Sequence, residues 1–145
     1  MKFEAFRDRS LIMGLLLASQ SVSQWLKREI TEKSDLSVLG SLILTSIHFE
    51  GRNETTGPSR LSSTLGVSRS RISQELSALE GQGLIRRVIN SESARSTSLL
   101  LTAAGEKKAN ELIKTYTRLQ RMIDAKVGEN HAEATNRTLL KLTDL

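Results

Sequence analysis

The segment from Ser68 to Gln74 carries side chains whose chemistry suits contact with nucleic acid. Hydroxyl, guanidinium and amide groups follow one another closely there, and such groups form hydrogen bonds with phosphates and base edges. The candidate contacts in this segment are Ser68, Arg69, Ser70, Arg71, Ser73 and Gln74. Arg60 before the segment, and Arg86 and Arg95 after it, complete the candidate set.

Apolar residues around this segment predict two short helices that bury a common seam. Their spacings of three and four keep them on one helical face, and they are Leu61, Leu65, Val67, Ile72, Leu76 and Leu79. Pro58 suits the first turn of a helix, and Gly66 suits the reversal because glycine reaches φ > 0 without steric cost. The pattern predicts a helix-turn-helix, which places its second helix in the major groove of DNA.

A β-hairpin is expected after the second helix. Gly81 and Gly83 end that helix, and residues 84–90 and 97–101 are rich in the residues that favour strands. Residues 91–95 form the tip, so Arg95 would reach the adjacent minor groove. Thr102 then caps a long helix running to about Val127.

Charge is concentrated in the same part of the chain. The 145 residues carry a net charge of +5, and residues 52–95 hold seven arginines against four glutamates, with no lysine. Arginine offers a planar fork for phosphates and guanine edges. A charge run alone is equally compatible with a solvated surface; on a helix-turn-helix and a hairpin it favours DNA.

Several functional classes are disfavoured. The chain has no cysteine, which excludes disulfides, cysteine-based zinc sites and thiol switches and is compatible with a reducing compartment. The longest apolar run, Leu11 to Ala18, is too short to span a bilayer. His48, Glu50 and His131 match no metal-ligand spacing. No nucleophile elbow, phosphate loop or carboxylate pair with a base is present, so we expect no enzyme and no cofactor.

The two ends of the chain predict helices with apolar stripes. Residues 3–32 are expected to form one long helix, followed by a helix over residues 35–50 with Ser34 or Asp35 as its N-cap. That second helix would point Leu36, Leu39, Leu42, Ile43 and Ile47 inward. After the break at Gly128, Asn130 and Glu133 are spaced as a capping box for a final short helix.

These elements predict a mainly α fold with a small β-hairpin wing, arranged as a single compact domain. Residues 36–102 would form the winged helix-turn-helix DNA-binding region. Residues 1–35 and 103–145 would form a helical dimerisation region, because apolar stripes at both ends need a partner and a second subunit provides one.

The order of elements resembles the MarR family of winged-helix transcriptional regulators over roughly residues 36–123. The resemblance rests on Val67-Ser68-Arg69-Ser70, on the run from Leu79 to Arg87, and on the spacing from Arg95 to Leu101-Thr102-Ala103-Ala104-Gly105. It implies that residues 68–74 read the major groove and that Arg95 is the wing arginine. The family commonly has an aspartate two residues before that arginine, where this chain has Ser93 beside Glu92. Either Glu92 takes over its role or Arg95 is held less firmly.

The resemblance also implies a cytoplasmic, nucleoid-associated homodimer that binds an inverted repeat in double-stranded DNA, usually as a repressor. Many such proteins release DNA when a small anionic or phenolic effector binds. Two alternatives stay open at this stage. A non-specific architectural DNA-binding protein would carry the same charge, and a winged-helix dimer could instead serve as a protein-interaction adaptor.

Overall fold

The computed structural model describes residues 2–51, 56–89 and 97–143. By their internal contacts the residues fall into two units, 1–38 and 39–145. No helix among the described residues is long and apolar enough to cross a membrane.

The N-terminal unit consists of successive helical segments. They are α1 (Phe3–Arg7), α2 (Leu11–Leu26), the π-helical turn η1 (Lys27–Thr31) and α3 (Glu32–Ser34). The prediction of one uninterrupted helix over residues 3–32 is therefore wrong. Ser10 has an extended backbone, and its hydroxyl accepts a hydrogen bond from the Met13 amide at 3.4 Å. Because serine is a favoured N-cap, it starts a new helix there.

The end of this unit also differs from expectation. Asp35 adopts a left-handed backbone with φ of 56° and terminates α3, and the next helix, α4 (Val38–Glu50), starts three residues later. Neither Ser34 nor Asp35 is its N-cap, so that prediction is wrong. The short polar side chain of aspartate tolerates the left-handed conformation, which explains why it can end a helix as well as begin one.

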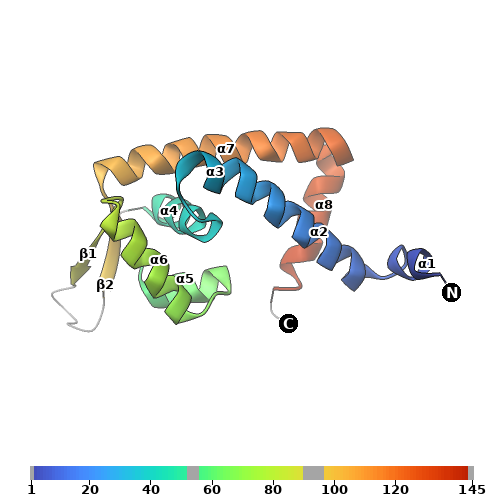
Figure 1. Ribbon diagram of the computed structural model, residues 1–145, viewed down its shortest axis with the longest axis horizontal. Helices are drawn as coiled ribbons and strands as arrows, with labels where there is room; N and C mark the ends of the chain where they lie inside the picture. Colours follow the sequence, from blue (N-terminus) through green and yellow to red (C-terminus); the bar gives the residue numbers. More distant parts are fainter. Residues whose placement is uncertain (1, 52–55, 90–96, 144–145) are drawn as a thin grey trace. The chain divides into compact units, whose positions relative to one another are not determined.

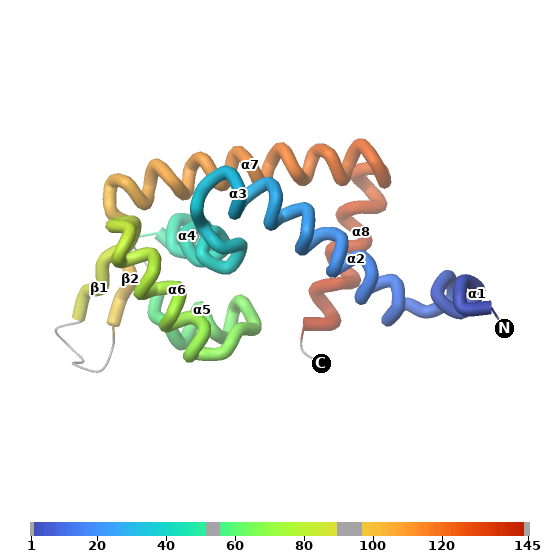
Figure 2. Tube along the Cα trace, in the orientation of Figure 1, coloured from blue at the N-terminus to red at the C-terminus, as the bar shows by residue number. Residues whose placement is uncertain are grey.

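The second unit is built around a long helix. α7 (Ala103–Val127) passes over α4, has the hairpin at its N-terminal end and is followed at its C-terminal end by α8 (Glu129–Leu140) (Figures 1 and 2). The Ser41 hydroxyl of α4 lies 2.7 Å from the Tyr116 hydroxyl of α7. Buried residues flank this contact on both helices, namely Ile43, Leu44, Ile47, Ala109, Leu112 and Leu119.

Two sequence predictions in this unit are wrong. Leu42 is 38% exposed instead of inward, because the buried face of α4 is set by Gly40, Ser41, Ile43, Leu44 and Ile47. α8 already begins at Glu129 with Gly128 as its N-cap, so Asn130 lies inside the helix and forms no capping box.

The helix-turn-helix is formed as predicted. α5 (Pro58–Leu65) has Pro58 in its first turn and ends at Gly66 with φ of 62°. α6 (Arg69–Gly81) follows after a short turn. Of the expected seam, Leu61, Ile72, Leu76 and Leu79 are buried, and Leu65 and Val67 are partly buried.

The hairpin also has the expected strands. β1 (Ile85–Ile89) pairs antiparallel with β2 (Thr97–Leu101), with Ile85 opposite Leu101 and Ile89 opposite Thr97. The predicted tip, including Arg95 and Ser93, lies outside the described residues. Thr102 caps α7 as predicted, since its hydroxyl accepts a hydrogen bond from the Gly105 amide at 3.0 Å.

Gly105 allows α7 to start directly against the hairpin. A Cβ atom at this position would lie 1.9 Å from the Leu84 carbonyl oxygen, which is backbone and cannot move aside without distortion. We expect Gly105→Ala to lower the free energy of unfolding by about 1–3 kcal/mol, although alanine gains about 1 kcal/mol of helix propensity. Urea unfolding measures the change. Gly81→Ala is the control, because its Cβ meets nothing within 4 Å, and equal stability of the two variants would contradict the close approach.

The buried Tyr116 hydroxyl should make the stability of the fold depend on pH. Burial raises its pKa above 10.0, and the hydrogen bond with Ser41 lowers it in part. Because the folded state favours the neutral phenol, this stability is fully present below the unfolded pKa near 10 and is lost as the pH rises through the higher folded value. Urea unfolding between about pH 9 and pH 11 should show a steeper loss for the wild type than for Tyr116→Phe. An equal loss of stability with pH in the wild type and in Tyr116→Phe would contradict this prediction.

Candidate nucleic-acid interface

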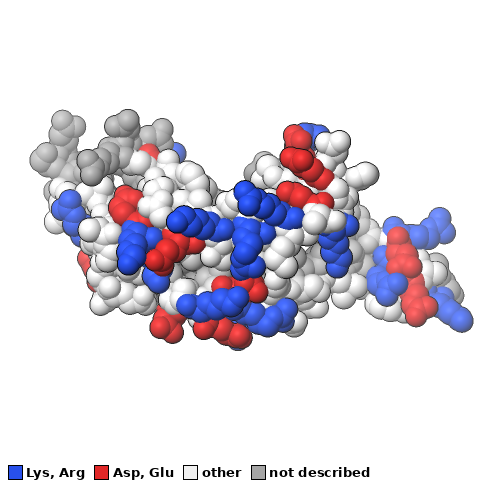
Figure 3. All heavy atoms as spheres, turned by 90° about the horizontal axis from the view of Figure 1, so that it is seen from above, with Lys and Arg blue, Asp and Glu red and all other residues white. Residues whose placement is uncertain are grey.

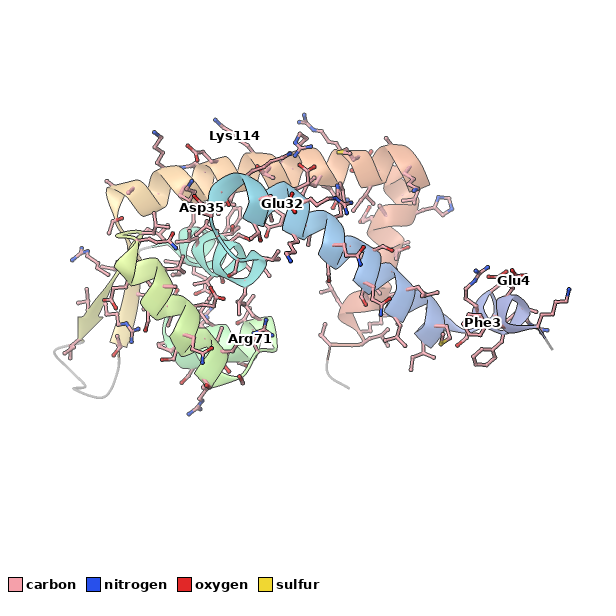
Figure 4. The ribbon with its side chains drawn as sticks, in the orientation of Figure 1. Phe3, Glu4, Glu32, Asp35, Arg71 and Lys114 are labelled. Carbon is pink, nitrogen blue, oxygen red and sulfur yellow. The ribbon has the colours of Figure 1, made fainter. Side chains whose placement is uncertain are left out.

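The outer face of α6 displays the predicted contact residues together. Arg69, Ser70, Arg71, Ser73 and Gln74 are all exposed, as is the N-cap residue Ser68. Figure 4 shows Arg71 near the start of α6, at the end remote from α7. The opposite face of the same helix carries the buried seam. The helix therefore presents a continuous polar surface that is backed by rigid packing.

The turn before α6 fixes where this face begins. The Ser62 hydroxyl donates to the Val67 carbonyl at 2.6 Å, and the Val67 amide donates to the Ser62 carbonyl at 3.1 Å. The Ser68 hydroxyl then accepts from the Arg71 amide at 3.3 Å and caps the helix. With one amide of the first turn satisfied by a side chain, the remaining amides and the helix dipole favour an anion at this end.

The candidate arginines fall into two groups. Arg69, Arg71 and Arg86 are exposed, and they form no ion pair within the described part of the chain. Arg60 instead pairs with Glu50, the last residue of α4, at 3.3 Å. Arg95 lies outside the described residues, so its predicted wing contact remains a prediction.

Arg87 has a role that sequence reasoning missed. Its Nε lies 3.1 Å from Glu80 Oε2 at the end of α6, and its Nη2 lies 3.5 Å from the Ser77 hydroxyl. This side chain therefore links β1 to α6, whereas the neighbouring Arg86 forms no such link within the described residues. Strand alternation was the available signal, because adjacent residues of a strand point to opposite faces.

The outer surface of α7 has a different character. Viewed from above α7, acidic and basic side chains are interspersed (Figure 3), and the Lys108 ammonium lies 3.6 Å from Glu111. Mixed charge of this kind is typical of a solvated helix face. His48 Nδ1 lies 2.8 Å from Glu106 Oε2, and no cluster suited to a metal ion occurs in the described ranges.

Solved structures share this architecture over nearly their whole length. Staphylococcus aureus MepR in a DNA complex has a TM-score of 0.80 at 15% identity, covering 94% of this chain and 96% of its own. BldR from Sulfolobus solfataricus, a transcriptional regulator, has a TM-score of 0.77 at 20% identity, covering 97% and 99%. PcaV from Streptomyces coelicolor, a transcriptional regulator solved with its natural ligand, has 0.82 at 15% identity, covering 95% and 94%.

No protein-family model matches the sequence, and no curated protein does. The identities to the solved structures are low, so the likeness establishes the fold. It confirms the mainly helical class with a two-stranded wing that the sequence predicted.

Ser68 offers a test of the turn. Removing the capping hydroxyl leaves an amide of the first turn of α6 without its partner, so Ser68→Ala should lower the free energy of unfolding by about 0.5–2 kcal/mol. Ser70→Ala is the matched control, because Ser70 is an exposed serine two residues later, in the first turn of α6, and does not cap the helix. Thermal and urea unfolding of both variants measure the difference, and equal stabilities would show that the cap contributes nothing.

The fold on which these residues are arranged is that of the winged helix-turn-helix transcriptional regulators.

Proposed function

We propose that this chain is a sequence-specific regulator of transcription that binds double-stranded DNA and acts as a repressor. It is not proposed to be an enzyme. The observation that carries the proposal is the exposed face of α6, where Arg69, Arg71 and Gln74 lie opposite the buried residues Ile72, Leu76 and Leu79. Arginine and glutamine can read guanine and adenine edges in the major groove, and serine adds phosphate or base contacts. MepR, which has the same fold, was solved bound to DNA.

The regulator would act as a homodimer on an inverted repeat. Large apolar side chains of α1 and α2 are exposed in the single chain, namely Phe3, Phe6, Leu11, Ile12, Leu16, Leu17 and Val22. Leu139 and Leu140 of α8 are exposed as well. A symmetric dimer would cover such surfaces and place two recognition helices about 34 Å apart, one turn of DNA.

The proposed effector is a small anionic or phenolic compound. The proposed location is the cytoplasm, in association with the nucleoid. PcaV, which has the same fold, was solved with its natural ligand, and this supports by analogy that an effector binds. Differential affinity of the effector for the DNA-free form would be needed to release DNA.

The proposal is tested by binding of the purified protein to DNA beside its own gene. Fluorescence anisotropy with excess random competitor, at two salt concentrations, separates specific from non-specific affinity. Competitor-resistant binding supports a sequence-specific regulator. Binding that the competitor abolishes would favour an architectural protein, and no binding to any duplex at low salt would favour a protein-interaction adaptor.

Arg71→Ala sharpens the same measurement. If Arg71 contacts a base edge, its loss should weaken operator binding by about 1–3 kcal/mol and relax specificity at one position. Lys114→Ala on the outer face of α7 is the matched control, because it removes one exposed positive charge away from the proposed interface (Figure 4). Equal weakening on operator and random DNA would show that Arg71 contacts phosphate only.

A further inference from the structure

Arg87 connects the first strand of the hairpin to two side chains of α6. Its Nε lies 3.1 Å from Glu80 Oε2, and its Nη2 donates to the Ser77 hydroxyl at 3.5 Å. The Ser77 hydroxyl in turn donates to the Ser73 carbonyl at 3.0 Å. Residues 73, 77 and 80 are spaced by four and three, so they lie along one face of the helix. One guanidinium therefore contacts the side of α6 that faces the hairpin.

This contact lies away from the point where the backbone joins the two elements. The chain passes from α6 into β1 through Gly83, and the Leu84 amide donates to the Leu79 carbonyl at 3.0 Å. Arg87 is two residues further along β1 than its first residue, Ile85, which corresponds to roughly 6.6 Å. β1 and α6 pack against each other and lie side by side in Figure 1. A contact at that distance from the connection resists rotation of the hairpin about it.

The pair of Arg87 and Glu80 is better suited to positioning than to stabilising the fold. Their side chains are 34% and 44% exposed. Exposed ion pairs contribute little to the free energy of unfolding, because water screens the charges. The hairpin is anchored to the core by apolar residues, since Ile85 and Leu99 are both buried. Loss of the pair should therefore let the hairpin move relative to α6 while the chain stays folded.

We propose that Arg87 is a positioning residue that fixes the angle between the hairpin and α6, so that both meet the operator together; this inference rests on the proposed function. On the operator, base contacts of α6 fix the protein on the DNA, and a hairpin at the wrong angle loses its own contacts. On random DNA no base contact fixes α6, and the attraction is mainly ionic. Arg87 consequently raises operator affinity more than random-DNA affinity, although it contacts Glu80 and not a phosphate.

Arg87→Met and Glu80→Met test this, because each breaks the pair and keeps most of the side-chain length, while their effects on net charge are opposite. We expect the ratio of operator affinity to random-DNA affinity to fall roughly three- to tenfold in both variants. The salt dependence of random-DNA binding should stay unchanged in Arg87→Met, because no phosphate contact is lost. Fluorescence anisotropy on both DNAs at several salt concentrations measures both quantities.

A direct DNA contact by Arg87 predicts a different result for its acidic partner. Glu80→Met would then release the guanidinium to a phosphate and leave or raise operator affinity, while Arg87→Met alone would weaken binding and reduce the salt slope by about one. That outcome overturns the inference and leaves the proposed function intact. Absence of any duplex binding by the wild type would instead overturn the proposed function, and the inference with it.

The matched controls are Lys108→Met and Glu111→Met. They break an ion pair of 3.6 Å that lies within α7 and joins no two elements, and they change the net charge by the same amounts. Their affinity ratio should equal that of the wild type. An equal fall of the ratio in these controls would show a general effect of charge and overturn the inference.

Exchanging the two charges, by combining Arg87→Glu with Glu80→Arg, should restore the pair across the same gap without changing the net charge. The double variant should recover most of the affinity ratio that Arg87→Glu alone loses, since the two residues act through each other. It also provides the test if either methionine variant unfolds in a thermal melt. No recovery in the double variant would overturn the inference, because a carboxylate on β1 would then be repelled by the DNA itself.

Discussion

The backbone around Leu84 joins α6, the hairpin and α7. Gly83 takes a left-handed conformation with φ of 71°, which lets the chain leave α6 and enter β1 directly. The Leu84 carbonyl accepts from the Thr102 amide at 3.0 Å, and the Thr102 hydroxyl donates to the Gly83 carbonyl at 2.5 Å. Because Gly105 lacks a Cβ, α7 can begin against the same carbonyl. The placement of α6 relative to the strands is therefore set near Leu84 by backbone contacts and by the Thr102 hydroxyl.

This separation of support from surface also explains the composition of α6. Ile72, Leu76 and Leu79 are buried and fix the helix by packing, while Ser73, Gln74, Ser77 and Ala78 between them are exposed. Changes on the outer face would alter what is bound with little effect on stability, since exposed substitutions usually change stability by less than about 0.5 kcal/mol. Specificity can thus vary on a constant fold, consistent with the low identity to solved structures that share it.

The sequence predicted correctly those features that depend on residues close together in the chain, such as the ends of helices. Pro58, Gly66 and Thr102 act within one helical turn, so their positions could be predicted. The left-handed Asp35 could not, because an aspartate serves equally well at either end of a helix. Contacts between distant segments were also missed: Ser41 and Tyr116 are separated by 75 residues, and the pairing of Arg60 with Glu50 needs the orientation of two helices. The nine candidate contact residues remain predictions, and which of their arginines form ion pairs could not be predicted without the fold.

The difference between paired and unpaired arginines determines how strongly DNA binding by the proposed interface would depend on salt. Each phosphate neutralised by a free cation releases a counterion, so the salt dependence counts cations that are available to DNA. Arg69, Arg71 and Arg86 are available in this sense, whereas Arg60 and Arg87 already face carboxylates. The seven arginines of residues 52–95 therefore overstate the non-specific attraction. Weaker attraction to random DNA favours a sequence-specific regulator, because specificity is the ratio of its affinity for the operator to its affinity for random DNA.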